Sequence, residues 1–467
     1  MPLCRLALIA AAALLELSGC GGSAEAVQAR PPYRHFHSRP DLKPAPVSIL
    51  TRTGRASPGY IFIAPKRDVA QTGPLILDNQ GQVVWFLPLD TKGVTDFRVQ
   101  RYRGRPVLTW WRGRTKVGAH AIPYAIYDAS YRPIAHVQPG NDLGGDIHEF
   151  LITRHNTALI TVSHGVRFNG RRVLEGGVQE LDIRTGRVLF QWLSTDHVAL
   201  AESYYRPPRD RSRTFDYFHI NSIQVEADGN LLVSARNTHT VYEISRRTGE
   251  ILWRLGGKRS DFALGRGVRF AWQHDARRRP DGALTLFDNE ASPQVRKQSR
   301  GLVLRLDMKR MRATLVRSFL HRPRLIAVDQ GNMQLLPNGH YLVGWGHQPY
   351  FTEFGPHGKQ LLDGRFGRGR VDSYRAYRFR WTGRPTRPPA VAVERDTVYV
   401  SWNGATEVAK WQLLAGPDPR TLRPVRTVRK DGFETAIPRG GEAEWVAVRA
   451  LDRHGRTLGR SLAVRGS

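Results

Sequence analysis

Residues 241–253 read V-Y-E-I-S-R-R-T-G-E-I-L-W, and the arrangement of this stretch decides the fold. Two short runs of alternating apolar and polar residues flank a polar turn that contains Thr248-Gly249. Such alternation on both sides of a glycine-containing turn is typical of a β-hairpin. The same arrangement returns at Leu75–Phe86, Ala125–Val137, Gln179–Trp192, Leu304–Val316 and Phe351–Leu362.

The spacing of these hairpins indicates a repeated four-stranded unit. Between them lie further strand patterns with turns at Asp228-Gly229, Asp281-Gly282 and Asn338-Gly339. Six units at a spacing of roughly 45–65 residues fit the blades of a β-propeller, and no sustained helical periodicity interrupts them. We therefore predict an all-β protein with a six-bladed β-propeller over residues 46–383. A parallel β-solenoid is the structural alternative, although its repeats are shorter and more regular.

The end of the chain has a different pattern. Arg384–Pro389 reads R-P-T-R-P-P, which is typical of a linker. It is followed by the strand patterns Val398–Gly404, Ala409–Gly416 and Glu444–Asp452. These predict a small fibronectin-III-like β-sandwich over residues 390–467. No catalytic grouping occurs there, so we expect a role in packing or adhesion.

The first twenty residues have the composition of a targeting segment. The apolar run Leu6–Leu15 is too short to span a bilayer, and L-S-G-C at residues 17–20 resembles a bacterial lipobox. We predict a lipoprotein signal peptide over residues 1–20, a lipidated Cys20 and a tether over residues 21–45. The mature protein would then be exported and anchored to the outer face of the cytoplasmic membrane. Simple secretion is the alternative, because Glu16 is atypical near the cleavage position.

Cysteine content and charge restrict the possible functions. Cys4 and Cys20 are the only cysteines, so the sequence predicts neither a structural disulfide nor a cysteine metal site. The net charge of +30 has two interpretations, an anionic partner or a solvated basic surface. The predicted export and the lack of a nucleic-acid-binding motif argue against nucleic acid as the partner.

Three histidines recur at the same place in successive repeats. They are His148 in D-I-H-E-F, His219 in Y-F-H-I-N-S-I and His274 in W-Q-H-D-A, each a short step before an apolar strand. Equivalent positions of a repeat occupy equivalent places in space, so in a closed ring the three imidazoles converge on one axis. A single histidine is usually structural, but three in matching register indicate a shared site.

Other polar residues share this register. Arg236 ends the apolar strand that follows His219, and Asn221 lies two residues after His219, on the same face of a regular strand. Asn332, in Q-G-N-M-Q, replaces the histidine in a later repeat. Three imidazoles can hold a metal ion, but a neighbouring arginine repels a cation. Arginine with histidines instead favours an oxyanion such as a sulfuryl or phosphoryl group, and we predict no metal site.

With these motifs the chain resembles the bacterial arylsulfotransferases, the PAPS-independent aryl-sulfate sulfotransferases. The resemblance covers about residues 70–370. Besides the three histidine motifs it rests on Ser234–Tyr242, Leu284–Asn289, Gly331–Gln334 and Val343–Phe354. It implies a six-bladed propeller that moves a sulfuryl group between phenols through a sulfated histidine, without a cofactor.

The resemblance also assigns roles. It implies that His274 is the nucleophile, that His219 exchanges a proton with the phenol, and that Arg236 and His148 stabilise the transferring group. Asn221 and Asn332 are the expected polar substrate contacts, and Trp345 an expected wall of the aryl pocket, together with aromatics such as Trp272. Unlike the best-studied branch, this chain has no disulfide and no separate N-terminal β-domain, so the acceptor and the oligomeric state stay open.

Three other functions compete with this interpretation. A non-catalytic binding propeller would keep the blades without needing the histidines and the arginine. A quinoprotein dehydrogenase is suggested by Thr248–Trp253, which resembles a tryptophan-docking motif, but the motif occurs cleanly once and no adjacent cysteine pair exists. A hydrolytic sulfatase normally needs a metal and a C/S-x-P-x-R motif, which the sequence lacks.

Overall fold

The computed structural model describes residues 32–113 and 124–466, and within them the protein is almost entirely β-structure. Two 3-10 turns, η1 (Ser194–Asp196) and η2 (Leu200–Glu202), are the only helical elements among the described residues. The described part of the chain has no helix with the length and hydropathy needed to cross a membrane. The predicted signal peptide, Cys20 and the first part of the predicted tether lie outside the described residues.

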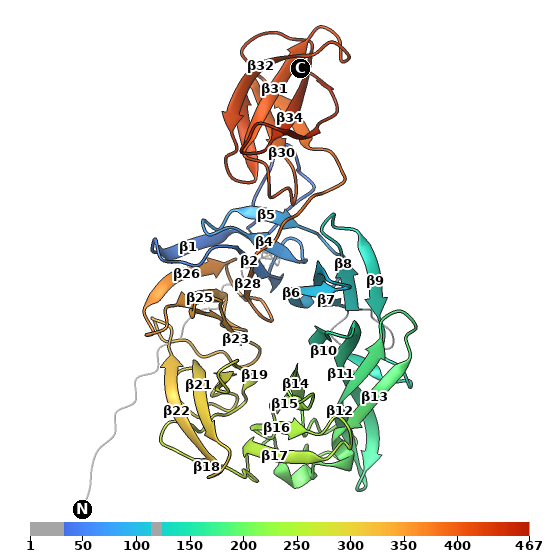
Figure 1. Cartoon of the computed structure of the whole chain (residues 1–467), viewed down its shortest axis with the longest axis vertical. Coiled ribbons are helices and arrows are strands. Elements are labelled where there is room, and N and C mark those ends of the chain that lie inside the picture. The colour runs from blue at the N-terminus through green and yellow to red at the C-terminus, as the bar shows by residue number, and fades with distance from the viewer. Residues whose placement is uncertain (1–31, 114–123, 467) are drawn as a thin grey trace, which may run out of the picture. The chain divides into compact units, whose positions relative to one another are not determined.

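Small antiparallel sheets follow one another along the chain and are arranged around a common centre (Figure 1). Three of them are built from four consecutive strands each. These are β6 (Val94–Tyr102), β7 (Arg105–Arg112), β8 (Tyr124–Tyr127) and β9 (Pro133–Val137); β10 (Gly144–Ile152), β11 (Thr157–Phe168), β12 (Arg171–Asp182) and β13 (Val188–Leu193); and β14 (Ile220–Val225), β15 (Leu231–Ala235), β16 (Thr240–Ile244) and β17 (Ile251–Gly256).

The next two sheets have the same four-strand core and one added strand each. One has the order β18-β22-β21-β20-β19, and the other has the order β1-β26-β25-β24-β23. Their strands are β18 (Ala263–Leu264), β19 (His274–Arg278), β20 (Leu284–Asp288), β21 (Arg300–Asp307) and β22 (Arg312–Phe319); and β1 (Val47–Arg52), β23 (Asn332–Leu335), β24 (Tyr341–Gly344), β25 (Tyr350–Phe354) and β26 (Gln360–Phe366).

Both ends of this region close the ring. The remaining sheet has the order β28-β2-β4-β5, so β28 (Tyr377–Phe379) pairs with β2 (Tyr60–Ile63) beside β4 (Leu75–Leu77) and β5 (Val83–Phe86). The early strand β1 pairs in turn with β26 of the preceding sheet. A shorter pair, β3 (Lys66–Arg67) with β27 (Val371–Asp372), joins the same two stretches of chain. This is the arrangement of a β-propeller, and the antiparallel sheets exclude the β-solenoid alternative.

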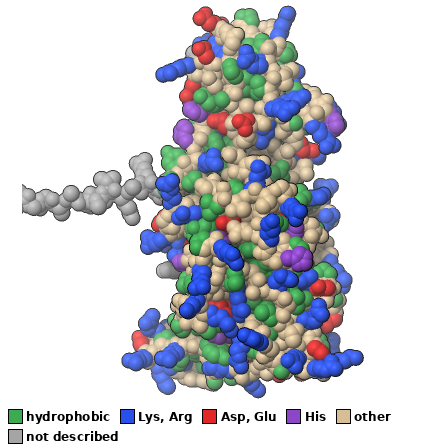
Figure 2. All heavy atoms as spheres, turned by 90° about the vertical axis from the view of Figure 1, so that its left-hand side faces the viewer, with side chains coloured by type: hydrophobic (Ala, Val, Ile, Leu, Met, Phe, Trp, Pro, Cys, Tyr) green, Lys and Arg blue, Asp and Glu red, His purple; other side chains and the backbone are tan. Residues whose placement is uncertain are grey.

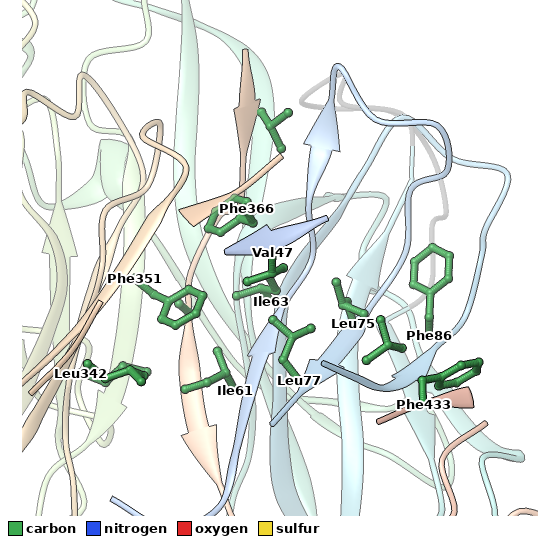
Figure 3. Packing of buried hydrophobic residues seen from close by; sticks show 14 of the residues in the cluster. Val47, Ile61, Ile63, Leu75, Leu77, Phe86, Leu342, Phe351, Phe366 and Phe433 are labelled. Carbon is green, nitrogen blue, oxygen red and sulfur yellow. The ribbon is translucent and has the colours of Figure 1, made fainter. Parts of the chain in front are cut away.

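Each hairpin expected from the sequence forms the two outer strands of a four-strand core. Residues 241–253, for example, form β16 and β17, which pair across the predicted turn. The apolar side chains of neighbouring sheets meet in separate buried clusters. Figure 3 shows one of these clusters, in which Leu342 and Phe351 pack against Ile61 and Ile63 across the junction of the last sheet and the closing sheet. Sheets that are covered on both faces explain why the strand β15 is buried at all five of its residues.

The C-terminal residues form two further sheets around their own core. One sheet has the order β29-β30-β33 and the other the order β32-β31-β34-β35, with β36 also paired to β34. Their strands are β29 (Ala390–Glu394), β30 (Thr397–Ser401), β31 (Lys410–Gly416), β32 (Arg423–Arg429), β33 (Glu434–Pro438), β34 (Trp445–Leu451), β35 (Thr457–Arg460) and β36 (Val464–Arg465). Trp411, which is fully buried, lies in the core shared by these strands.

Polar contacts attach this C-terminal region to the ring. The side-chain amide of Asn403 donates to the Phe86 carbonyl at 2.8 Å, and its oxygen accepts from the Phe86 N–H at 3.0 Å. Asn403 therefore satisfies the free backbone groups at the edge strand β5.

The described part of the predicted tether is not extended. Phe36 is 8% exposed and packs on Phe433 at a ring-centroid distance of 4.3 Å, and Glu434 accepts hydrogen bonds from the backbone of His37 and Ser38. This corrects the prediction of a tether up to residue 45, because apolar residues at 36 and 42 are buried against the fold.

Basic side chains are dispersed over the surface. Figure 2 shows Lys and Arg side chains over the whole visible face, interspersed with acidic and apolar side chains rather than gathered into one patch. On this face the basic side chains therefore belong to a solvated surface of mixed charge.

Candidate active site

The three predicted histidines lie on the innermost strands of three consecutive sheets. His148 lies within β10, His219 directly precedes β14, and His274 is the first residue of β19. β14 contacts both β10 and β19, and the three strands surround the centre of the ring in Figure 1. The histidines thus lie close to the axis, as their positions in the repeat predict.

An irregularity in the strand pairing accompanies each histidine. The register shifts lie between Gly145 and Phe150, between Ile220 and Ser222, and between His274 and Arg277. His219 has a φ of 56°, in the left-handed region. Bulges of this kind redirect side chains and are frequent beside active sites. Simple strand alternation therefore does not hold here, and His219 and Asn221 do not form the same-face pair that the sequence suggested.

The four predicted catalytic side chains lie within electrostatic reach of one another. The rings of His148 and His219 meet edge to face, with centroids 4.9 Å apart. His274 is 1% exposed, and burial is the main reason why its pKa lies well below the usual 6.5. The charges of Arg236, His148 and His219 lower the pKa further. His274 is consequently a neutral imidazole at neutral pH.

The hydrogen bonds around His274 define its tautomer. Its Nδ1 lies 2.7 Å from Asn289 Oδ1 and 3.1 Å from the Trp272 carbonyl, and both of these atoms are acceptors. The Asn289 amide donates to the carbonyls of Ala327 and Gln330, which fixes the direction of its oxygen. Nδ1 of His274 must therefore carry the proton, which leaves a lone pair on Nε2. Nε2 accepts one long contact, 3.3 Å, from the Gln330 N–H.

Carboxylates orient the other two histidines, and the sequence analysis did not identify them. His148 Nδ1 is hydrogen-bonded to Asp146, and His219 Nδ1 lies 2.5 Å from Asp216 Oδ2. Burial raises the pKa of Asp146, but His148 and His219 outweigh burial and leave the pKa below 3.8. The available signal was an acid two or three residues before each histidine, in D-I-H and D-Y-F-H.

Among the residues that the structure describes, the guanidinium of Arg236 has hydrogen-bond partners for only some of its N–H groups. Its Nη1 donates to Asn237 Oδ1 at 2.8 Å, and the group lies over the Trp272 ring at 5.0 Å. Within the described chain, the buried Nε has no hydrogen-bond partner. Burial lowers the pKa of Arg236 below its ordinary value, while Asp216 and Asp329 counteract that shift. A guanidinium with a free donor beside the neutral imidazole of His274 suits an anionic group with several oxygens.

Aromatic side chains continue from Arg236 toward the surface. Trp272 meets His239 edge to face at 4.4 Å, and His239 stacks on Tyr204 at 4.1 Å. Tyr204 is 40% exposed, so this series runs from the buried site to solvent. On another side, Tyr374 meets His148 at 5.6 Å. Of these residues, the sequence analysis placed Trp272 alone near an aryl group.

The three predicted substrate contacts have structural roles in the described protein, and their contact with a substrate stays a prediction. Asn221 is buried and donates to the Gln273 carbonyl at 2.7 Å. Asn332 exchanges two hydrogen bonds with the backbone of Ala376, at 2.8 and 2.9 Å. Trp345 is fully buried and donates to Thr352 Oγ1 at 2.9 Å. The two asparagine amides connect neighbouring inner strands. The sequence of a single strand does not reveal such a contact.

The described residues contain no cluster of metal ligands. In residues 32–113 and 124–466, no group of three or more His, Cys, Asp or Glu side chains is arranged to hold a metal ion. Cys20, the predicted lipidation site, lies outside these ranges.

Comparison with known proteins places these residues in a family context. A family model described as Arylsulfotransferase (ASST) matches residues 98–367, more than half of the chain. All predicted catalytic and substrate-binding residues lie within that segment. No curated protein matches the chain.

Two solved structures are among those that align with the chain. A protein of unknown function from Bacteroides caccae aligns with a TM-score of 0.42 at 12% identity, covering 68% of this chain and 98% of that chain. An inactive virginiamycin B lyase from Staphylococcus aureus aligns with a TM-score of 0.35 at 10% identity, covering 77% of this chain and 97% of that chain.

The environment of His239 predicts a pH dependence of stability. Burial, followed by Arg236 and Lys258, lowers the pKa of His239 to about 3. Between pH 6.5 and pH 3 the unfolded chain therefore binds a proton that the folded chain does not, so the free energy of unfolding falls as the pH falls. For one proton the slope is about 1.4 kcal/mol per pH unit.

We expect His239→Gln to lower this slope by the contribution of about one proton. The measurement is the free energy of unfolding in urea at several pH values in that range. The exposed His357→Gln, with the same chemical change, is the control and should leave the slope unaltered. Equal slopes for wild type and His239→Gln would contradict the burial of a neutral imidazole at this position.

Proposed function

The chain belongs to the arylsulfotransferase family, and from this premise we propose that it moves a sulfuryl group from a phenolic sulfate ester to an acceptor phenol through a sulfated His274. One observation carries the proposal. The lone pair of His274 Nε2 is available at neutral pH, because Asn289 and the Trp272 carbonyl hold the ring proton on Nδ1 and burial lowers the pKa. A neutral imidazole beside a guanidinium is a competent nucleophile toward an anionic sulfate ester.

In the first half-reaction, Nε2 of His274 attacks the sulfur, and the bond from sulfur to the aryl oxygen breaks. The electron pair of that bond leaves with the phenolic oxygen, which takes a proton from His219. Arg236 and His148 stabilise the charge on the sulfuryl oxygens during the transfer. Asp216 Oδ2 lies 2.5 Å from His219 Nδ1 and holds the ring in place for this proton exchange.

The second half-reaction reverses the first with a different phenol. His219 takes the proton of the incoming hydroxyl, whose oxygen attacks the sulfur, and the bond from nitrogen to sulfur breaks. His274 then regains its Nε2 lone pair. The protons balance over the two half-reactions, because His219 gives one proton to the phenolate of the donor and takes one from the hydroxyl of the acceptor. Trp272 lies beside Arg236, and His239 and Tyr204 continue from it, which supports an aryl group held on that side of the site.

We extend the proposal to the architecture and the cellular location. Six blades over residues 46–383 account for the sheets of the ring, including the closing sheet that contains both β2 and β28. For residues 390–467, sheets of three and five strands support a fibronectin-III-like sandwich. Residues 1–20 act as a lipoprotein signal peptide, and acylation of Cys20 anchors the protein to the outer face of the cytoplasmic membrane.

Sulfuryl transfer predicts a covalent adduct on one histidine. Purified protein incubated with a chromogenic aryl sulfate should release the aryl alcohol faster when phenol is added, and intact mass should rise by about 80 Da before phenol is added. His274→Ala should abolish both signals. His197→Ala is the matched control, because His197 stacks on Trp192 away from the site, and it should retain them. Neither turnover nor adduct with several donors would instead favour a binding propeller.

Orientation of His219 by a carboxylate predicts a second effect. Asp216→Asn removes the carboxylate that holds His219 Nδ1 while it keeps the shape, so kcat should fall by at least about tenfold, most strongly for poor phenolic leaving groups. Asp210→Asn, in the same loop but exposed, should leave kcat unchanged. Equal rates for Asp216→Asn and wild type would remove His219 from its role as the proton donor.

Lipid anchoring predicts a change of cell fraction. With intact Cys20 the protein should sediment with membranes and incorporate labelled palmitate. Cys20→Ala should lose the label and move to the soluble extracytoplasmic fraction. A wild-type protein that is soluble and unlabelled would establish simple secretion instead.

A further inference from the structure

A buried cluster of six charged side chains adjoins the three histidines and takes no part in the transfer described above. Its members are Asp96, Arg98, Glu149, Asp275, Arg277 and Arg375. The cluster contains three acids and three arginines. Burial raises the pKa of Glu149, but Arg277, Arg375 and Arg98 outweigh burial and leave that pKa below its usual value. At Asp96 burial outweighs Arg98 and Arg375 and raises the pKa. Glu149 is therefore an ionised group inside the protein, which persists because it is paired with arginines.

Arg375 is the hub of this cluster. It lies between β27 and β28, in the segment that closes the ring, and its side chain has no exposed surface. Its contacts are Nη1 with Asp96 Oδ1 at 2.8 Å, with Tyr377 Oη at 3.1 Å and with Glu149 Oε1 at 3.2 Å, and Nη2 with the Asn221 carbonyl at 2.9 Å, with Glu149 Oε2 at 3.3 Å and with Asp275 Oδ1 at 3.6 Å. One guanidinium thus joins the inner strands β6, β10, β14 and β19 to the closing segment.

The partners of Arg375 are sequence neighbours of the site histidines. Glu149 follows His148, and Asp275 follows His274. The Asn221 carbonyl is two residues after His219. Arg375 therefore contacts each of the three inner strands within two residues of its histidine.

The backbone at these positions needs such support. Asp275 has a φ of 57° and His219 a φ of 56°, both in the left-handed region. Such conformations persist when surrounding contacts determine them. The register shifts of the three inner strands also occur here, where the regular ladder does not hold the backbone.

We propose that Arg375 is a positioning residue of the active site, whose planar guanidinium sets the relative placement of His148, His219 and His274. This inference rests on the proposed sulfuryl transfer. Arginine is required because the fixed fork of Nη1 and Nη2 reaches carboxylates and a carbonyl at the same time, whereas the single ammonium group of lysine cannot. Arg375 lies beyond residues 98–367, so the family match does not assign it a role.

A matched pair of substitutions tests this role. Arg378→Lys is the control, because Arg378 is also buried and ion-paired, to Glu353 at 3.0 Å, and lies three residues further along the chain. Its side-chain contacts are with Ser57, Gly59, Asn79 and Glu353, away from the histidine-bearing strands. We expect both variants to lose thermal stability. Arg375→Lys alone should lower kcat about a hundredfold, with KM for the donor within a few-fold of wild type, because small misplacements of reacting groups are costly.

A second readout does not depend on activity. In protein labelled with 15N-histidine, the imidazole signals of His148, His219 and His274, assigned by single substitutions, should shift in Arg375→Lys and stay unchanged in Arg378→Lys. If Arg375→Lys fails to fold, Tyr377→Phe removes one neighbour of the guanidinium and should lower kcat about three- to tenfold, with smaller shifts of the same signals.

Three results would overturn the proposal: kcat of folded Arg375→Lys within about threefold of wild type, an equal loss of kcat in Arg378→Lys, or unchanged imidazole signals in Arg375→Lys. Failure of the proposed function has a different signature. In that case the wild-type protein itself shows no turnover and no adduct, and the imidazole signals alone decide whether Arg375 positions the histidines.

Discussion

The pairing of β28 with β2 is the contact on which the site depends, because it joins the two ends of the ring. Strands so far apart in sequence pair at a substantial cost in chain entropy. The buried clusters between neighbouring sheets, such as the one that contains Ile61 and Phe351, offset this cost through apolar burial. The inner strands surround a common axis only when the ring is closed. The segment that leads into β28 also delivers Arg375 to the same axis.

The three histidines share a position in the repeat but not an environment. His274 is almost fully buried, and burial lowers its pKa although the hydrogen bond to the Asn289 amide oxygen acts in the opposite direction. His148 and His219 instead face the carboxylates of Asp146 and Asp216. Residues at equivalent places in the repeat therefore have different partners at Nδ1, an amide oxygen for the proposed nucleophile and a carboxylate for the other two histidines.

Contacts from the N-terminal segment and the C-terminal region cover the outer edge of the closing sheet. Asn403 reaches from the C-terminal region to the edge strand β5 and satisfies both groups of the Phe86 backbone. Phe36, from the N-terminal segment, packs on Phe433 beside it. The exposed edge of the closing sheet is therefore covered, which protects it from pairing with other chains. The C-terminal region has a function in the fold even though it carries no part of the site.

The amino-acid sequence by itself determined the strands, their pairing into hairpins and the recurrence of His148, His219 and His274, because these follow from short-range alternation and from turns. Only the tertiary structure decided which way the side chains point. Bulges beside the histidines break the alternation that linked Asn221 to His219, and Asn332 and Trp345 turn into the contacts between and within sheets. An acid two or three residues before a histidine was a weak indication of the role of Asp146 and Asp216. Nothing in the sequence around Arg375 indicated its role. Its partners lie up to 279 positions away, and a pairing over such a distance has no period or turn to mark it.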